Sequence, residues 1–115
     1  MFARIALYQD IDMEKFGPVA AWFEEHGAEL NEGFAGFQGE MTLLDRGNSQ
    51  MIGLGLYNTA AEAQAADVTM DQGPPPGMPE HLVAVLQRAT RVHRGVYEVV
   101  SSQGRLSVAS SASVL

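Results

Sequence analysis

The alternation of strand-like and helix-like segments constrains the fold of this chain more than any other feature. Residues 2–9 are rich in β-forming residues and stop at Asp10, which predicts a strand. Apolar residues then recur at three- and four-residue spacing over residues 12–32, a period that predicts an amphipathic helix. Two further strand-like stretches, residues 38–45 and 50–57, flank a polar turn and together predict a β-hairpin.

A second helical region and a last strand complete the pattern. Thr59 and Glu62 have the spacing of a capping box, so a helix is expected to begin there. Residues 71–77 are rich in glycine and proline and interrupt this helix, which resumes near Pro79. Residues 96–100 predict the fourth strand. The order β-α-β-β-α-β predicts a ferredoxin-like α+β domain, a four-stranded antiparallel sheet with helices on one face.

The start of the first helix is ambiguous in the sequence. Asp12 is a good N-cap residue, but Pro18 lacks a backbone N–H and would lose a hydrogen bond deep inside a helix. The regular helix therefore begins either directly after Asp12 or at Gly17, with Pro18 in its first turn. Gly33 provides the stop.

The length of the chain fits one domain. A chain of 115 residues is too short for two ordinary domains, and a hydrophobic fraction of 46% is enough for a core without disulfides. We expect the ferredoxin-like domain to cover residues 1–101. The serine-rich residues 102–115 are expected to form a tail, in which Leu106 and Val108 suit a short edge strand.

Composition and charge narrow the function classes. The chain has no cysteine, which removes disulfides and thiolate sites and fits a reducing compartment such as the cytoplasm. A formal net charge of -7, with scattered arginines, makes nucleic acid and anionic membranes poor partners. No apolar run approaches the roughly 20 residues that a membrane-spanning helix needs, and the N-terminus does not resemble a signal peptide.

Apolar side chains occur on both faces of the predicted sheet. In the first strand Ala3, Ile5 and Leu7 alternate with Phe2 and Tyr8, so neither face is plainly polar. Helices on one side cover only one face of a sheet, and an uncovered apolar face is an aggregation hazard. A second copy of the chain is the simplest cover, so we expect a homodimer that forms through the sheet.

Two stretches carry a resemblance to a known family. Residues 26–39, HGAELNEGFAGFQG, are similar to a leucine-containing helix that is followed by a Gly-Phe-x-Gly entry into a strand. Residues 54–59, LGLYNT, are similar to a strand end with an aromatic residue before a polar helix cap. Over about residues 1–101 the chain resembles the dimeric α/β-barrel superfamily, and within it the small proteins related to antibiotic-biosynthesis monooxygenases.

The resemblance implies a homodimer with a pocket between sheet and helices in each subunit. Some relatives oxidise polycyclic aromatic compounds without metal or flavin, others degrade haem, and many have no assigned activity. The haem-degrading branch uses an asparagine in its first strand, a tryptophan at the end of its third strand and a histidine on its second helix. Here the first asparagine is Asn31, the strand-ending aromatic is Tyr57, and no histidine lies between Tyr57 and His81, so haem degradation is not expected.

Aromatic residues and glycines supply the candidate pocket. Tyr8, Trp22 and Tyr57 suit an aromatic site in which a planar substrate stacks, although core packing explains them as well. Gly53 and Gly55 share one face of the third strand, where missing side chains either open a cavity or allow close packing. The proline-rich residues 73–79 are either a lid over such a cavity or a connector.

The histidines are weak candidates for chemistry. His26, His81 and His93 are formal acid–base candidates, but their spacing is not that of a metal-binding pair, so no metal site and no cofactor are expected. Tyr57, which suits substrate orientation, and His26, on the first helix, are the best catalytic candidates. Two functions stay open: cofactor-independent oxidation of a small aromatic compound, or non-catalytic small-molecule binding, including a stress-associated role.

Overall fold

The computed structural model describes residues 1–104. In chain order its elements are β1 (Phe2–Gln9), α1 (Met13–Glu32), β2 (Phe37–Asp45), the short 3-10 helix η1 (Arg46–Asn48), β3 (Gln50–Tyr57), α2 (Ala60–Asp71), α3 (Glu80–Arg88) and β4 (Thr90–Glu98). This order confirms the predicted ferredoxin-like fold, with the second helical region split into α2 and α3. The predicted edge strand at Leu106 and Val108 lies outside the described residues, and the division at residue 101 stays a prediction.

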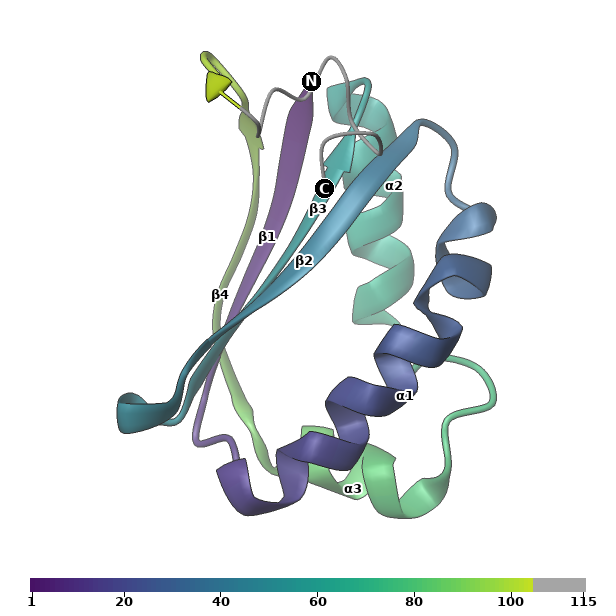
Figure 1. Ribbon diagram of the computed structural model, residues 1–115. Coiled ribbons are helices and arrows are strands. Elements are labelled where there is room, and N and C mark those ends of the chain that lie inside the picture. Colours follow the sequence, from purple (N-terminus) through teal and green to yellow (C-terminus); the bar gives the residue numbers. More distant parts are fainter. Residues whose placement is uncertain (105–115) are drawn as a thin grey trace.

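The four strands form one antiparallel sheet in the order β2-β3-β1-β4. Figure 1 shows α1, α2 and α3 on the same side of this sheet, so its other face has no helix over it. Among the helices of residues 1–104, none is long and apolar enough to pass through a bilayer.

Two apolar clusters hold the helices on the sheet. Phe16 and Val19 of α1 are buried with Leu82 and Val85 of α3 at one end of the sheet. At the other end Tyr57 of β3 is buried with two small residues of α2, Ala63 and Ala66. Because the two clusters lie apart, the middle of the helix-facing surface of the sheet is left without a dense core.

The structure places the start of α1 at Met13 and not at Gly17. The Asp12 side chain accepts a hydrogen bond from the Glu14 N–H, and Pro18 lies inside the helix. Pro18 is exposed, and burial of Phe16 and Val19 on the opposite side offsets the single backbone hydrogen bond that it cannot make. Of the two starts left open by the sequence, the one after Asp12 is correct.

The last strand begins six residues earlier than predicted. β4 covers Thr90–Glu98, whereas the sequence pattern indicated residues 96–100. Its first half is polar because two arginines on its helix-facing side reach α2. Arg94 lies 3.5 Å from Asp67, and Arg91 pairs with Asp71. Local hydrophobic alternation therefore misses a strand whose inward side chains are charged.

A network of three arginines and two aspartates attaches α2 to the sheet. The Arg4 Nε atom on β1 donates a hydrogen bond of 2.9 Å to Asp67 Oδ1, and both side chains are largely buried, at 9% and 14% exposure. Arg94 Nη1 lies 2.8 Å from Asp71 Oδ1, and Arg91 also donates to Asp71. The Arg91 hydrogen bond holds the pKa of the Asp71 carboxyl below its ordinary value. Asp71 therefore stays ionised at neutral pH.

The sheet face opposite the helices is apolar. Register places Ile5 and Leu7 of β1 beside Leu54 and Ile52 of β3 on this face. Two large side chains at its edges are strongly exposed: Leu43 at 46% and Tyr97 at 45%. The structure thus shows on this face the apolar surface that the alternation of the sequence predicts.

The cap of α2 can be tested by mutation. Thr59 Oγ1 accepts a hydrogen bond of 3.1 Å from the Glu62 N–H, and Glu62 Oε1 accepts one from the Thr59 N–H. Thr59→Ala removes this capping box and is expected to lower the free energy of unfolding by about 1 kcal/mol in urea titrations. Thr69→Ala, an exposed change on the same helix, is the control and should cost much less. Equal losses would contradict the cap.

Candidate functional site

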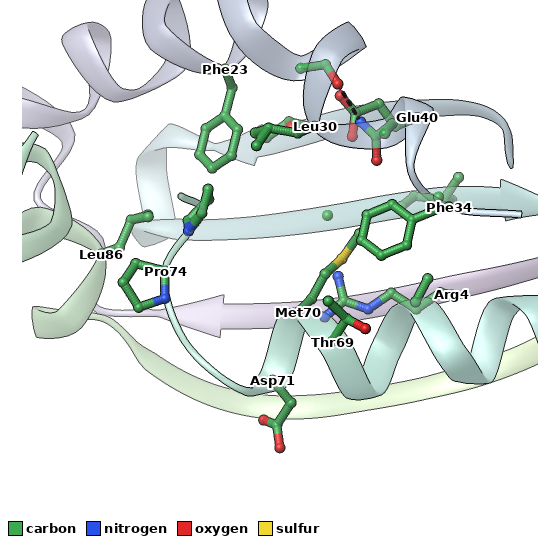
Figure 2. Close-up of a pocket in the computed structure, with 18 of the residues that line it drawn as sticks. Arg4, Phe23, Leu30, Phe34, Glu40, Thr69, Met70, Asp71, Pro74 and Leu86 are labelled. Atoms are coloured by element: carbon green, nitrogen blue, oxygen red, sulfur yellow. Dashed lines mark hydrogen bonds between the residues drawn. The ribbon is translucent and has the colours of Figure 1, made fainter. Parts of the chain in front are cut away.

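A cavity of about 1580 Å³ lies between the sheet and the helices. Its apolar lining includes Phe23, Leu30, Phe34, Met51, Met70 and Leu86. Figure 2 shows Phe23, Pro74 and Leu86 around one end and Arg4, Phe34 and Met70 around the other. Such a volume is at or above the upper end of ordinary small-molecule pockets, so the cavity has room for a ligand of several fused rings.

The floor of the cavity is made by β3. A Cβ atom added to Gly53 would meet no atom within 4 Å, so this position opens directly onto the cavity. Gly55 differs, because an added Cβ would lie 3.0 Å from the Tyr57 ring and hydroxyl. The Tyr57 ring therefore folds back over Gly55, and only glycine leaves space for it there.

Tyr57 carries a buried hydroxyl with no bonding partner. The residue has 0% exposure, and its hydroxyl makes no hydrogen bond to any other described residue. An unpaired buried hydroxyl costs about 1–3 kcal/mol, so such groups are rare in native structures and require an explanation. Because Tyr57 also lines the cavity, a ligand with a polar atom is the natural partner.

Burial raises the pKa of the Tyr57 phenol above its ordinary value. The Arg4 guanidinium opposes this rise, and the carboxylates of Glu40 and Asp67 add to it. The phenol is therefore neutral at physiological pH and retains its proton as a hydrogen-bond donor.

Arg4 is a buried cation at this end of the cavity. Its side chain projects from β1 on the helix-facing side, is 8% exposed as a residue and lines the cavity. The hydrogen bond to Asp67 uses Nε, which leaves the two Nη groups of the guanidinium available to a ligand. Sequence reasoning did not select Arg4. The available signal was a cation between Phe2 and Ala6 on a face that otherwise carries apolar residues.

Four of the predicted pocket residues line the cavity: Tyr8, Gly53, Gly55 and Tyr57. Trp22 and His26 are absent from its lining among the described residues. Their rings pack against each other on α1 with centroids 4.7 Å apart, and the His26 side chain is 37% exposed beside Glu25. The spacing that puts Trp22 and His26 on one side of α1 turns that side away from the cavity.

The proline-rich segment borders the cavity. Residues 73–76 belong to its lining, and Met78, which follows them, is buried in the cluster around Phe16. The segment is thus a wall of the cavity that is fixed at one end by a core residue. Within residues 1–104, no three histidine or acidic side chains gather closely enough to bind a metal ion.

The raised pKa of Tyr57 predicts a distinct alkaline titration. Because the folded state holds the phenol proton more tightly than the unfolded state, the stability it contributes is present below about pH 10 and lost as the pH rises through the raised pKa. Absorbance titration at 295 nm should show a phase above pH 10 that Tyr57→Phe removes. Tyr97→Phe, on the opposite face of the sheet, should retain it. An unchanged titration in Tyr57→Phe would contradict this assignment.

No protein-family profile and no curated protein matches the chain. Among solved structures, the chain is similar to the heme-degrader MhuD from Mycobacterium tuberculosis with two hemes bound in its active site. That match has 16% identity, a TM-score of 0.61, and covers 90% of this chain and 100% of that one. A mutant of MhuD with two manganese protoporphyrin IX molecules per active site matches with 19% identity and a TM-score of 0.59, over 90% of this chain and 99% of that one. At these identities the likeness shows the fold alone: the chain has a ferredoxin-like α+β fold.

Proposed function

We propose that this chain is a monooxygenase-like protein whose cavity binds a planar aromatic compound and oxidises it with molecular oxygen. The observation that carries the proposal is the buried, unpartnered hydroxyl of Tyr57 in a large cavity with mostly apolar walls. Apolar walls bury the rings of a ligand, and a few placed polar groups orient it. Tyr57 would donate its hydrogen bond to a carbonyl or hydroxyl oxygen of the substrate.

The proposed reaction needs no redox group from the protein. A ring CH₂ that is activated by a neighbouring carbonyl becomes a carbonyl, and the substrate supplies all four electrons. One atom of O₂ enters the product and the other leaves as water, so that R₂CH₂ + O₂ gives R₂CO + H₂O. The part of Tyr57 is to orient the reacting carbon by holding a substrate oxygen, and the apolar walls exclude bulk water.

The cavity does not fit heme as an iron-ligating site. Heme iron in proteins is held by histidine, cysteine, methionine or tyrosinate. The chain has no cysteine, and His26, His81 and His93 are all outside the cavity lining. Tyr57 is a poor ligand because its raised pKa disfavours the phenolate. Although the similar structures contain heme or a manganese porphyrin, we do not assign heme to this chain.

Non-catalytic binding is the second candidate function. It is favoured by one observation: among the described residues that line the cavity there is no histidine, the side chain whose ordinary pKa lies near neutrality. Catalysis that depends on proton transfer would then rest on less suitable groups. A binding protein needs only the apolar walls and the Tyr57 hydroxyl.

A substitution that fills the cavity should distinguish oxidation and ligand binding from a purely structural role of the cavity. Gly53→Leu adds a side chain where the structure has open space, and its backbone needs no glycine conformation, so the fold is expected to persist. Oxygen uptake and ligand-induced thermal shifts would be measured with a panel of two- and three-ring hydroxyaromatics and cyclic aryl ketones. We expect Gly53→Leu to reduce both by about tenfold or more, since the added side chain takes the place of the ligand.

Two further variants sharpen this test. Gly17→Leu adds the same side chain at an exposed position of α1 with open space and should leave both readouts unchanged. Tyr57→Phe keeps the ring and removes the hydroxyl, and should reduce turnover. Thermal shifts without oxygen uptake would select the binding function, and neither response from the wild type would contradict both.

We also propose that the chain forms a homodimer through the sheet face opposite the helices. The support is the set of apolar side chains on that face, of which Leu43 and Tyr97 are strongly exposed. A second copy would bury them in a symmetric contact. A cytoplasmic location, which the absence of cysteine favours, stays a prediction.

A charge placed on the open sheet face tests the dimer. Leu43→Asp should raise the dimer dissociation constant by about tenfold or more in sedimentation equilibrium, because burying an unpaired carboxylate is costly. Val68→Asp is the matched control, since Val68 is similarly exposed, at 54% against 46%, but lies on α2. A wild-type chain that remains monomeric at micromolar concentration would contradict the proposal.

A further inference from the structure

We infer that the cavity selects aromatic anions, such as aryl carboxylates or ionised aromatic hydroxyls, and that Arg4 is the residue that selects them. This inference rests on the proposed aromatic-binding function and specifies its ligand class. It is carried by the position of a buried guanidinium beside an unpartnered hydroxyl in an apolar cavity.

Arg4 is buried more deeply than packing alone explains. A guanidinium that is 8% exposed requires compensation, because removing a cation from water is costly. Within residues 1–104 its side chain makes one hydrogen bond, from Nε to Asp67 Oδ1, which occupies one of its five donors. The Nη groups lie at the same end of the cavity as Phe34 and Met70, where Figure 2 shows the Arg4 side chain among the lining residues.

Within the network of three arginines and two aspartates, positive charges outnumber negative charges by one. Arg4, Arg91 and Arg94 carry three positive charges, and Asp67 and Asp71 carry two negative ones. Asp67 is shared, since its second oxygen lies 3.5 Å from Arg94, so Arg4 does not have a carboxylate to itself. A bound anion would complete the charge balance of the network.

Other ionisable groups act against an anion, since the cavity lining also includes Glu24, Glu29, Glu40, Glu62 and Asp71. Their charges act more weakly than that of Arg4, because all of them except Glu62 are exposed to water, and Glu62 is bonded in the Thr59 cap. Glu40 on β2 and Asp67 on α2 both influence Tyr57, which places their negative charges near the same end of the cavity. Glu40 is exposed, so water screens its charge, whereas the charge of Arg4 acts from a buried position. Tyr57 itself is a neutral donor and adds no negative charge.

The available donors match the geometry of a carboxylate or phenolate oxygen. Arg presents parallel N–H groups that suit planar oxyanions, and hydrogen bonds to charged acceptors are stronger than neutral ones. The Arg4 Nη groups and the Tyr57 hydroxyl would donate to one anionic oxygen or carboxylate, while the rings occupy the space above Gly53. A neutral amide isostere would still accept a hydrogen bond through its carbonyl oxygen, but without the charge that strengthens the bond to Arg4.

The test compares two isosteric probes, 2-naphthoate and 2-naphthamide, by isothermal titration calorimetry at neutral pH and moderate salt. Wild-type protein should bind the naphthoate about tenfold or more tightly than the amide, the difference expected for one charge-assisted interaction. Arg4→Gln should reduce this ratio to below about threefold, since the amide side chain carries no charge. The pair 2-hydroxy- and 2-methoxy-1,4-naphthoquinone repeats the comparison for an acidic hydroxyl.

Arg88→Gln is the matched control. It removes the same charge from an exposed arginine at the end of α3, which is not among the described residues that line the cavity. Its naphthoate preference should stay within about twofold of the wild type, because an exposed charge away from the cavity is screened. If Arg88→Gln lowers the preference as much as Arg4→Gln does, selection by Arg4 is overturned.

A double variant keeps the test decisive if Arg4→Gln alone fails to fold. Arg4→Gln leaves Asp67 without its buried partner, whereas Arg4→Gln/Asp67→Asn retains a neutral hydrogen-bonding pair. A folded double variant that still prefers the naphthoate would overturn the inference. Equal binding of both probes by the wild type would overturn anion selection and leave the aromatic pocket intact. Binding of neither probe would overturn the pocket as well.

Discussion

The buried ion pair between Arg4 and Asp67 connects the sheet, the helices and the cavity. It joins the centre of β1 to the middle of α2 across 63 residues of sequence, and Arg94 extends it to β4. Such pairs add little net stability relative to apolar packing, yet removing one partner costs about 3–5 kcal/mol. The pair therefore fixes the position of α2 and, as a consequence, holds a positive charge inside an otherwise apolar space.

A glycine two residues before a tyrosine occurs on two strands of the sheet, β3 and β4, which flank β1. On β3 the Tyr57 ring lies over Gly55, and on β4 the Tyr97 ring lies over Gly95, where an added Cβ would be 3.0 Å from it. The outcomes differ because the strands present these tyrosines to opposite faces. The Tyr97 hydroxyl meets the His93 ring on the open face, whereas the Tyr57 hydroxyl faces the cavity without a partner. The same local packing thus leaves a satisfied hydroxyl on one face and an unsatisfied one on the other.

Much of the fold follows from local patterns, and the remainder depends on distant charges. The period of the apolar residues, the capping box at Thr59 and the break at residues 71–77 predicted the order and nearly all boundaries of the elements. The first half of β4 escaped prediction because Arg91 and Arg94 are satisfied by aspartates of α2. Patterns within a short stretch of sequence cannot identify these aspartates, because they are distant from β4 along the chain.

The residues of the candidate site likewise fall into those that local patterns predicted and those that they did not. Alternation along β3 is sufficient to place Gly53, Gly55 and Tyr57 on one face, and all three line the cavity. Helical spacing did not reveal that Trp22 and His26 face away from it, since α1 has apolar residues on more than one side. Arg4 was not selected, because its local signal is only a cation on an otherwise apolar strand face, and its role depends on Asp67 and on the empty space beside Gly53.

The most direct measurement of the central claim is a crystal structure of the protein with 2-naphthoate bound. The account predicts that the rings lie in the cavity above Gly53 and that the carboxylate accepts hydrogen bonds from the Arg4 Nη groups and the Tyr57 hydroxyl. A naphthoate bound elsewhere, or a Tyr57 hydroxyl that bonds to a protein group while the cavity is filled by side chains, would contradict it.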